Sequence, residues 1–379
     1  MPRKEGQVIP RGDDTFLIRL YLGEDPKTGR RRYSNETFHG TEAKAHKRLR
    51  DKLSERDAGR HVEPAKLTLG EHLDNWLKRI ALQVQPRTAS DYAYMLERYV
   101  RPYLGPRRLS GLTFEHLEEH YADMLQQQGL SARTVIYTHR LLHSAFADAV
   151  KRKLITHSPV VYAEPPRQQR KEFQVLSELE APLFLTSAAA DQHAALFILA
   201  LTTGLRPEEY FGLQWEHVYL ERGIVAVRRT LVRQKGGGWY FSEPKTERSR
   251  RNVKLPLPTL RALIEHRKRQ AETRLKAGPA YQQNNLVFAT DDGSPLSIRN
   301  VTLRHYRPIL TRAGITKHLR LYDLRHSFAT LSLLAGVHAK VVSEALGHAS
   351  VAFTMDTYAH VLPSMQESAA EKIATLLFG

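Results

Sequence analysis

Five side chains in the second half of the sequence are of the types that a phosphoryl-transfer reaction uses. They are two arginines, a lysine, a histidine and a tyrosine: Arg206, Lys245, Arg325, His348 and Tyr358. When a hydroxyl attacks a phosphodiester in line, negative charge accumulates on the non-bridging oxygens, and two guanidiniums can bind those oxygens through paired hydrogen bonds. Arg206 and Arg325 fit that role. The set therefore predicts a phosphoryl-transfer reaction on a nucleic-acid backbone.

The other three groups fit the remaining steps of such a reaction. Tyrosine ionises with a pKa of about 10, and a guanidinium pair would stabilise its phenolate, which makes Tyr358 a candidate nucleophile. Lys245, in or beside a predicted turn among other cations, is a candidate general acid for the leaving 5′ oxygen. His348 could donate to a phosphate oxygen or shuttle the proton of the tyrosine. A phosphotyrosine link conserves the energy of the broken bond, so we expect no ATP, divalent metal or other cofactor.

The same residues have structural alternatives. The chain has 16 tyrosines, and most tyrosines pack their ring against the interior of a protein. Two helices predicted within residues 323–347 could also form a helix-turn-helix that reads DNA without any reaction. Only the combination of the five groups favours a catalytic role over these structural ones.

The sequence around each group predicts the element that holds it. The segment LFILALTTGLRPEEYFGLQW predicts an apolar helix that ends at Gly204 and a new helix that starts with Pro207, so Arg206 lies at a fixed corner. Glu209, one turn further on, is expected to orient an arginine. Strands are predicted for IVAVRRTLV and GGGWYF, and FSEPKTERSRRNVKLP predicts a turn that leads into a short strand. Residues 228–254 carry nine basic and two acidic side chains, which indicates a ribbon that faces phosphates.

Three helices are predicted towards the C-terminus. The first begins near Asp323 and ends at Gly336, with Arg325 in its first turn, and the second stops at Gly347. Tyr358 lies on a further short helix. The tail, residues 365–379, has Ile373, Leu376 and Leu377 at helical spacing. This apolar stripe would dock either on a neighbouring subunit or on its own domain.

The first half of the chain predicts two different architectures. The segment TFLIRLYLG predicts a strand in which alternate residues from Phe16 to Leu22 form an apolar face, while Arg19 and Tyr21 lie on the opposite face. A second strand that pairs with it is predicted in GRRRYSNETFHG, and a charged helix begins at Thr41. This unit could be a DNA-contacting arm or a scaffold. After a linker at residues 61–68 the pattern is helical to about residue 158, and HSPVVYAEPPRQQRKEF is typical of an extended basic connector.

Composition narrows the class of protein. The net charge of +17 and the pI near 9.9 favour a nucleic-acid partner, although ribosomal and membrane-surface proteins share such values. The absence of cysteine excludes disulfides and thiol chemistry, and no motif or cluster predicts a metal site. The longest apolar run, AALFILAL, is far shorter than the roughly 20 residues of a membrane span. We expect a soluble cytoplasmic protein without a membrane partner.

Four local signatures occur in an order that resembles a known family. The segments are TTGLRPEE, YDLRHSFATL, LGHAS and TMDTYAHV, with EPKTERSRR between the first two. Together they resemble the tyrosine recombinases, the phage-type integrase family. In that family Arg, Lys, Arg, His and Tyr at the matching positions form the active site, which implies that role for the five residues above.

The resemblance implies a multidomain protein, mainly α with small β-sheets. It would have a β-sheet-plus-helix arm-type DNA-binding domain (1–64), an all-α core-binding domain (65–160), a linker (161–175) and a mixed α+β catalytic domain with a C-terminal helix (176–379). The implied function is a site-specific recombinase that cleaves and rejoins double-stranded DNA through a 3′-phosphotyrosine, for integration or excision of a phage or mobile element. The implied assembly is a homotetramer on paired sites and a monomer or weak oligomer off DNA, with accessory DNA-bending proteins as further candidate partners.

One position departs from the family pattern. Three residues before Arg325 the family usually has histidine, and this chain has Tyr322. Tyrosine can donate a hydrogen bond to a phosphate oxygen but carries no positive charge at neutral pH. We keep Tyr322 as a candidate site residue, and His326 as a partial substitute that would point about 100° away on the helix. Two alternative functions remain: a type IB topoisomerase, and a catalytically silent DNA-binding regulator with the same fold.

Overall fold

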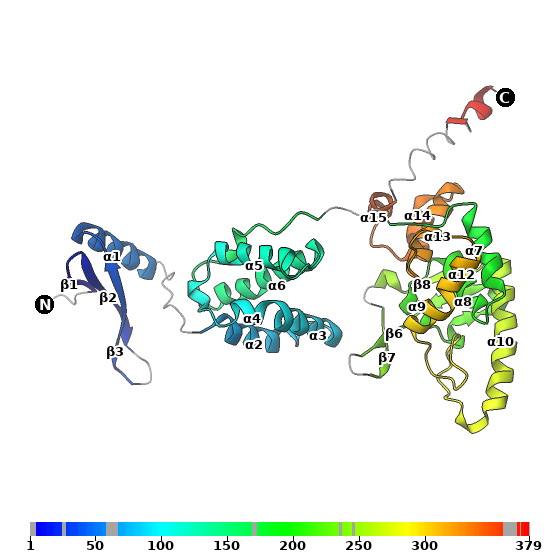
Figure 1. The fold of residues 1–379 in the computed structure, drawn as a ribbon, viewed down its shortest axis with the longest axis horizontal. Coiled ribbons are helices and arrows are strands. Elements are labelled where there is room, and N and C mark those ends of the chain that lie inside the picture. The colour runs from blue at the N-terminus through cyan, green and yellow to red at the C-terminus, as the bar shows by residue number, and fades with distance from the viewer. Residues whose placement is uncertain are drawn as a thin grey trace. The chain divides into compact units, whose positions relative to one another are not determined.

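The computed structural model describes residues 5–24, 28–57, 67–168, 173–234, 237–244, 247–358, 370–371 and 373–378. The chain divides into two compact units, Met1–Arg170 and Lys171–Gly379 (Figure 1). Within the described residues, no helix is both long and apolar enough to cross a membrane. The mainly helical architecture with small β-sheets that the sequence predicts is confirmed.

The first unit begins with a three-stranded antiparallel sheet covered by one helix. Its elements are β1 (Gly6–Gly12), β2 (Thr15–Glu24), β3 (Arg31–His39) and α1 (Glu42–Asp57), and the strand order is β1-β2-β3. Alternation along β2 buries Ile18 and Leu20 against Leu49 of α1. The predicted strands β2 and β3 and the predicted helix are present, whereas β1 was not predicted, because GQVIPRG carries a glycine at each end and a proline.

The remainder of the first unit is helical. Its helices are α2 (Leu69–Ile80), α3 (Pro86–Met95), α4 (Arg101–Leu104), α5 (Phe114–Gln126) and α6 (Ala132–Lys151), and one turn of π-helix joins α3 to α4. Thr68 and Glu71 form a capping box at the start of α2, which fixes where that helix begins. The apolar faces of α2 and α6 meet in one core around Leu73, Trp76 and Phe146.

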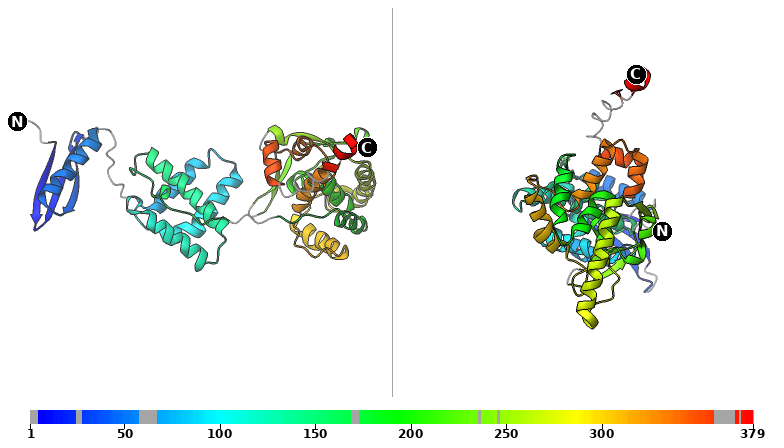
Figure 2. Two further views of the ribbon diagram at one scale, coloured as in Figure 1. Left: turned by 90° about the horizontal axis from the view of Figure 1, so that it is seen from above. Right: turned by 90° about the vertical axis from the view of Figure 1, so that its right-hand side faces the viewer.

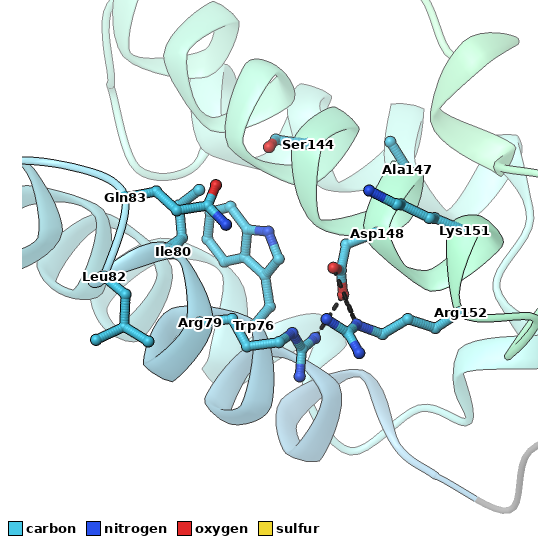
Figure 3. Close-up of a pocket in the computed structure, with 10 residues that line it drawn as sticks. All are labelled: Trp76, Arg79, Ile80, Leu82, Gln83, Ser144, Ala147, Asp148, Lys151 and Arg152. Atoms are coloured by element: carbon cyan, nitrogen blue, oxygen red, sulfur yellow. Dashed lines mark hydrogen bonds and ion pairs between the residues drawn. The ribbon is translucent and has the colours of Figure 1, made fainter.

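An open pocket of about 760 Å³ lies between the C-terminal halves of α2 and α6 (Figure 3). Arg79 from α2 and Arg152, just after α6, both point to the carboxylate of Asp148. Trp76 forms part of the apolar wall. The pair of arginines on one carboxylate leaves this end of the two helices with net positive charge.

The second unit contains the predicted site. Its elements are α7 (Glu180–Ala189), α8 (Ala194–Thr203), α9 (Pro207–Phe211), β4 (Val218–Tyr219), β5 (Ile224–Val227), β6 (Thr230–Arg233), β7 (Trp239–Ser242), β8 (Arg251–Lys254), α10 (Leu257–Ala277), α11 (Ile298–Val301), α12 (Arg307–Arg312), α13 (Asp323–Leu334), α14 (Ala339–Leu346) and α15 (Val351–Thr357). One sheet has the order β4-β5-β8, and β6 and β7 form a separate antiparallel hairpin. The single strand predicted for IVAVRRTLV is thus two strands, which belong to different sheets and are separated by Arg228 and Arg229.

Helix α8 is almost wholly buried and forms the centre of this unit, where it packs against α7, α10 and α13. Figures 1 and 2 show α13, α14 and α15 next to one another, and β8 lies against α14. Gly204 ends α8 with φ +64°, and a Cβ atom there would come within 2.3 Å of the Phe328 ring. The position therefore requires glycine, and it brings the end of α8 close to α13.

Candidate active site

The corner between α8 and α9 holds Arg206 as predicted. Pro207 starts α9, and the carboxylate of Glu209 accepts hydrogen bonds from the Arg206 backbone N–H (2.8 Å) and from Nη1 of its side chain (2.9 Å). The expectation that Glu209 orients an arginine therefore agrees with the structure. Because the Arg206 side chain is still 29% exposed, its guanidinium can reach a ligand outside the protein.

A second arginine, which the sequence analysis did not single out, holds the same carboxylate. Arg251 in β8 donates from Nη1 and Nη2 to the two oxygens of Glu209, at 2.9 and 2.8 Å, and from Nε to the carbonyl of Ala345 in α14. Burial raises the pKa of Glu209, but the hydrogen bonds and charge of Arg251 outweigh it, so the pKa is lowered overall. Glu209 is thus an anion clamped between two guanidiniums. The only sequence signal for Arg251 was its place in a basic stretch.

Arg325 lies in the first turn of α13, as predicted, and is buried. Its Nη1 donates to the carbonyl of Gly204 and its Nη2 to the carbonyl of Leu346, both at 2.7 Å. Burial, and then the charge of Arg206, lower the pKa of Arg325 to about 10. The guanidinium stays charged at neutral pH, and its remaining N–H groups can bind a phosphate oxygen.

His348 follows the αL residue Gly347 at the end of α14. Its Nδ1 lies 2.8 Å from the hydroxyl of Thr354 in α15, and its ring is edge-on to Phe353. Burial, followed by the charges of Arg325 and Arg206, lowers the pKa of His348 to about 3. The imidazole is therefore neutral at physiological pH and can donate a hydrogen bond without carrying charge.

Tyr358 is the residue directly after α15, and only 1% of it is exposed. Burial raises its pKa above the ordinary value for tyrosine, and the opposing charge of Arg325 is the smaller effect. The charge of Arg325 thus favours the phenolate, as expected, but burial is the larger effect. The hydroxyl is consequently protonated at neutral pH in this structure.

The Tyr358 hydroxyl lies 2.9 Å from Nδ1 of His326. As expected, His326 points about 100° away from Arg325 on the helix, and that rotation turns it towards α15 instead of towards the arginines. Phe173 stacks on the imidazole of His326 with ring centroids 4.1 Å apart. Tyr322, at the start of α13, places its ring 5.4 Å from the same imidazole.

Four of the predicted residues besides Arg325 thus surround the N-terminal part of α13: Arg206, Tyr322, His348 and Tyr358. Main-chain groups connect them, since Arg325 binds the carbonyls two residues before Arg206 and two residues before His348. Lys245 lies outside the described residues, between β7 and β8. The described side chains contain no group of three or more His, Cys, Asp or Glu that could hold a metal.

Tyr322 gives a first prediction. The structure records no hydrogen bond from its hydroxyl to a described residue, so the hydroxyl is available to a phosphate oxygen. We expect Tyr322→Phe to lose about 1–3 kcal/mol of transition-state stabilisation, or roughly ten- to a hundredfold in rate, and Tyr322→His to keep activity. Single-turnover cleavage rates at saturating protein measure this directly. A nearly silent Phe variant with a more damaged His variant would instead mean that the ring only packs beside His326.

The second unit matches a known family. The model of the phage integrase family matches residues 174–365, and that of the phage integrase N-terminal SAM-like domain matches residues 68–125. The chain belongs to the phage integrase family. It is a tyrosine-type site-specific recombinase, as the sequence signatures predict, and the two family models cover most of the helical part of the first unit as well as the site.

Individual relatives agree with this family assignment. A tyrosine recombinase XerC-like protein of Caldanaerobacter subterraneus subsp. tengcongensis is 29% identical over 98% of this chain and 99% of its own length. The phage-integrase fold recurs in the Tn1549 transposon integrase bound to a circular intermediate DNA, with a TM-score of 0.68, 21% identity, and coverage of 82% of this chain and 100% of that one. A lambda integrase tetramer bound to a Holliday junction has a TM-score of 0.56 at 17% identity, with coverage of 92% and 96%.

Proposed function

We propose that this phage-integrase family member cleaves and rejoins double-stranded DNA through a 3′-phosphotyrosine at Tyr358, during integration or excision of a mobile element. The observation that carries the proposal is the convergence on α13 of two guanidiniums, a neutral imidazole and a tyrosine hydroxyl. Arg206 and Arg325 bind the non-bridging oxygens of the scissile phosphate, and His348 donates a further hydrogen bond. Tyr322 contributes its hydroxyl to the same phosphate.

The reaction exchanges one phosphodiester for another. The Tyr358 oxygen forms a bond to phosphorus, the bond to the 5′ oxygen breaks, and Lys245 protonates the leaving oxygen. The 5′ hydroxyl of another strand then attacks the phosphotyrosine and releases the enzyme. The cations that stabilise the transition state are side chains, so the reaction needs no metal and no nucleotide.

A trapping experiment tests this function. We expect the wild-type chain to form a covalent adduct with a nicked duplex that carries the attachment site flanking its gene, in excess EDTA. The adduct should resist denaturation and should carry the DNA through its 3′ end, as shown by labelling each strand end separately. Cleavage that stops with EDTA and resumes with magnesium would identify a metal nuclease instead.

The proposed domain roles follow from charge and architecture. Residues 1–64 would contact arm-type DNA sites through the sheet, where Arg19 lies over the Tyr33 ring. Residues 65–160 would bind the core site, residues 161–175 would connect the two parts, and residues 176–379 would carry out cleavage. The net charge of +17 supports extensive phosphate contacts and predicts binding that weakens steeply with salt.

We further propose that the chain acts as a homotetramer on paired sites and is a monomer or weak oligomer off DNA. The C-terminal tail supports this, because Ile373, Leu376 and Leu377 are 56%, 83% and 67% exposed. Three exposed apolar side chains at helical spacing would gain from burial against another subunit.

Deletion of residues 366–379 tests this assembly. We expect it to weaken cooperative binding to paired sites by at least about tenfold and binding to a single site by less than about threefold, since phosphate contacts elsewhere are retained. Gel-shift titrations on one-site and two-site duplexes measure both. The triple substitution of Ile373, Leu376 and Leu377 by serine should reproduce the deletion. Equal losses on the two duplexes would mean that the tail supports only its own domain.

A further inference from the structure

The hydroxyl of the proposed nucleophile lies against a base that has no role in the reaction described above. Nδ1 of His326 is 2.9 Å from the Tyr358 oxygen. The two rings are 5.8 Å apart and inclined by 58°, so the contact runs from the edge of the imidazole to the phenol hydroxyl. With the ring proton on Nε2, this nitrogen accepts the hydrogen bond and is placed to receive the proton.

Aromatic contacts hold the imidazole in that position. Phe173 stacks on one face, with an angle of 17° between the rings, and also lies edge-on to Tyr358 at 5.5 Å. The Tyr322 ring is tilted against the imidazole at 5.4 Å. His326 is therefore fixed from the segment before α7, from the start of α13 and from the end of α15. Such support is what proton transfer over a single hydrogen bond requires.

The other described groups near the tyrosine are poor proton acceptors. His348 already uses Nδ1 with Thr354 and has a pKa lowered to about 3. Tyr322 is itself a phenol, and Arg325 is a cation. Tyr358 needs an acceptor, because burial raises its pKa and keeps the hydroxyl protonated. Within the part of the chain that the structure describes, His326 is the histidine whose nitrogen contacts the Tyr358 hydroxyl.

We propose that His326 is the general base of the cleavage step. As the Tyr358 oxygen bonds to phosphorus, its proton moves to Nδ1 of His326, and the 5′ oxygen leaves with a proton from Lys245. In rejoining, the imidazolium returns the proton to the phenol as the 5′ hydroxyl displaces it. No electrons are gained or lost. The inference rests on the proposed function.

Substitution by asparagine separates proton transfer from positioning. The Oδ1 of asparagine can accept the hydrogen bond that Nδ1 accepts but is not a base, so His326→Asn should slow single-turnover cleavage by about a hundredfold or more. His318→Asn, which changes an exposed histidine on the same domain, is the matched control and should be silent. Cleavage by His326→Asn within about threefold of wild type would overturn the proposal.

The leaving group distinguishes the base from the acid. A substrate with sulfur in place of the bridging 5′ oxygen releases a thiolate, which needs no proton. Lys245→Ala should therefore recover on this substrate, whereas His326→Asn should stay as slow as on the normal one. Recovery of His326→Asn by the sulfur substrate would overturn its assignment as base. Wild-type protein that cleaves neither substrate would overturn the proposed function itself.

A measurement on the unaltered protein covers the case in which the variants fold poorly. On the sulfur substrate, the wild-type rate should rise with pH as the imidazole of His326 loses its proton, and should level off once that nitrogen is free to accept. Among the described residues, the charged and titratable groups near His326 are Tyr322, Tyr358, Arg325 and His348, and burial and neighbouring charges lower the pKa of His348 to about 3. A rate that is independent of pH over the whole range in which the protein stays folded would contradict the proposal.

Discussion

Tyr358→Phe should form no covalent protein–DNA adduct while binding the same duplex with nearly unchanged affinity. The substitution removes one oxygen, the proposed nucleophile, from a ring that is already buried and packed against Phe173. Affinity comes from phosphate contacts spread over the chain. Adduct formation on a nicked substrate, followed by denaturing electrophoresis, measures the first effect, and a gel shift at fixed salt measures the second.

Tyr219→Phe is a suitable control, because it removes an exposed tyrosine hydroxyl from β4 of the same unit. It should leave adduct formation intact. A denaturation-resistant adduct formed by the Tyr358→Phe protein would show that another residue is the nucleophile. Loss of DNA binding together with loss of the adduct would show that the hydroxyl mainly supports the fold.

Arg251→Met should destabilise the second unit by about 3–5 kcal/mol, because it leaves the carboxylate of Glu209 buried with Arg206 as its one remaining cationic partner among the described residues. It should also lower the cleavage rate, since Glu209 would no longer hold Arg206 in a fixed orientation. Calorimetric unfolding of the full chain, which resolves the transition of this unit, measures the first effect. Single-turnover cleavage at saturating protein measures the second.

The neighbouring position provides the comparison. Arg250 also pairs with a glutamate, Glu243, but both side chains are about half exposed or more. Arg250→Met should therefore cost less than about 1 kcal/mol. Because the pKa of Glu209 is lowered from 4.5, the stability it contributes is complete above that pH and is lost as the pH falls through the folded-state value. An Arg251→Met protein as stable as the Arg250→Met protein would contradict the stabilising role of the buried Glu209–Arg251 ion pair.

The sequence predicted the elements that local signals control. The corner at Arg206 follows from a glycine and a proline three residues apart, and the end of α14 follows from Gly347. The strand β2 follows from alternation. These are effects of neighbouring residues on the backbone, and they can therefore be recognised from the sequence alone.

The parts that the sequence did not reveal depend on contacts between distant segments. Arg251 reaches Glu209 across 42 positions, and His326 meets Tyr358 across 32. The burial that raises the pKa of Tyr358 also arises from packing, and it outweighs the stabilising charge of Arg325 that the sequence led us to expect. The break between β5 and β6 was missed because two short apolar runs around Arg228 and Arg229 look like one strand.

The attachment of Arg325 has a consequence for how this site can evolve. Its guanidinium is held by the carbonyls of residues 204 and 346, and every amino acid supplies a carbonyl. The geometry of this arginine is therefore specified by the path of the backbone and not by the identity of a partner side chain. Drift in the surrounding sequence can be extensive, provided that the glycine at 204 and the packing of α8 on α13 persist. Conversely, grafting the arginine alone onto another scaffold would not transfer its orientation.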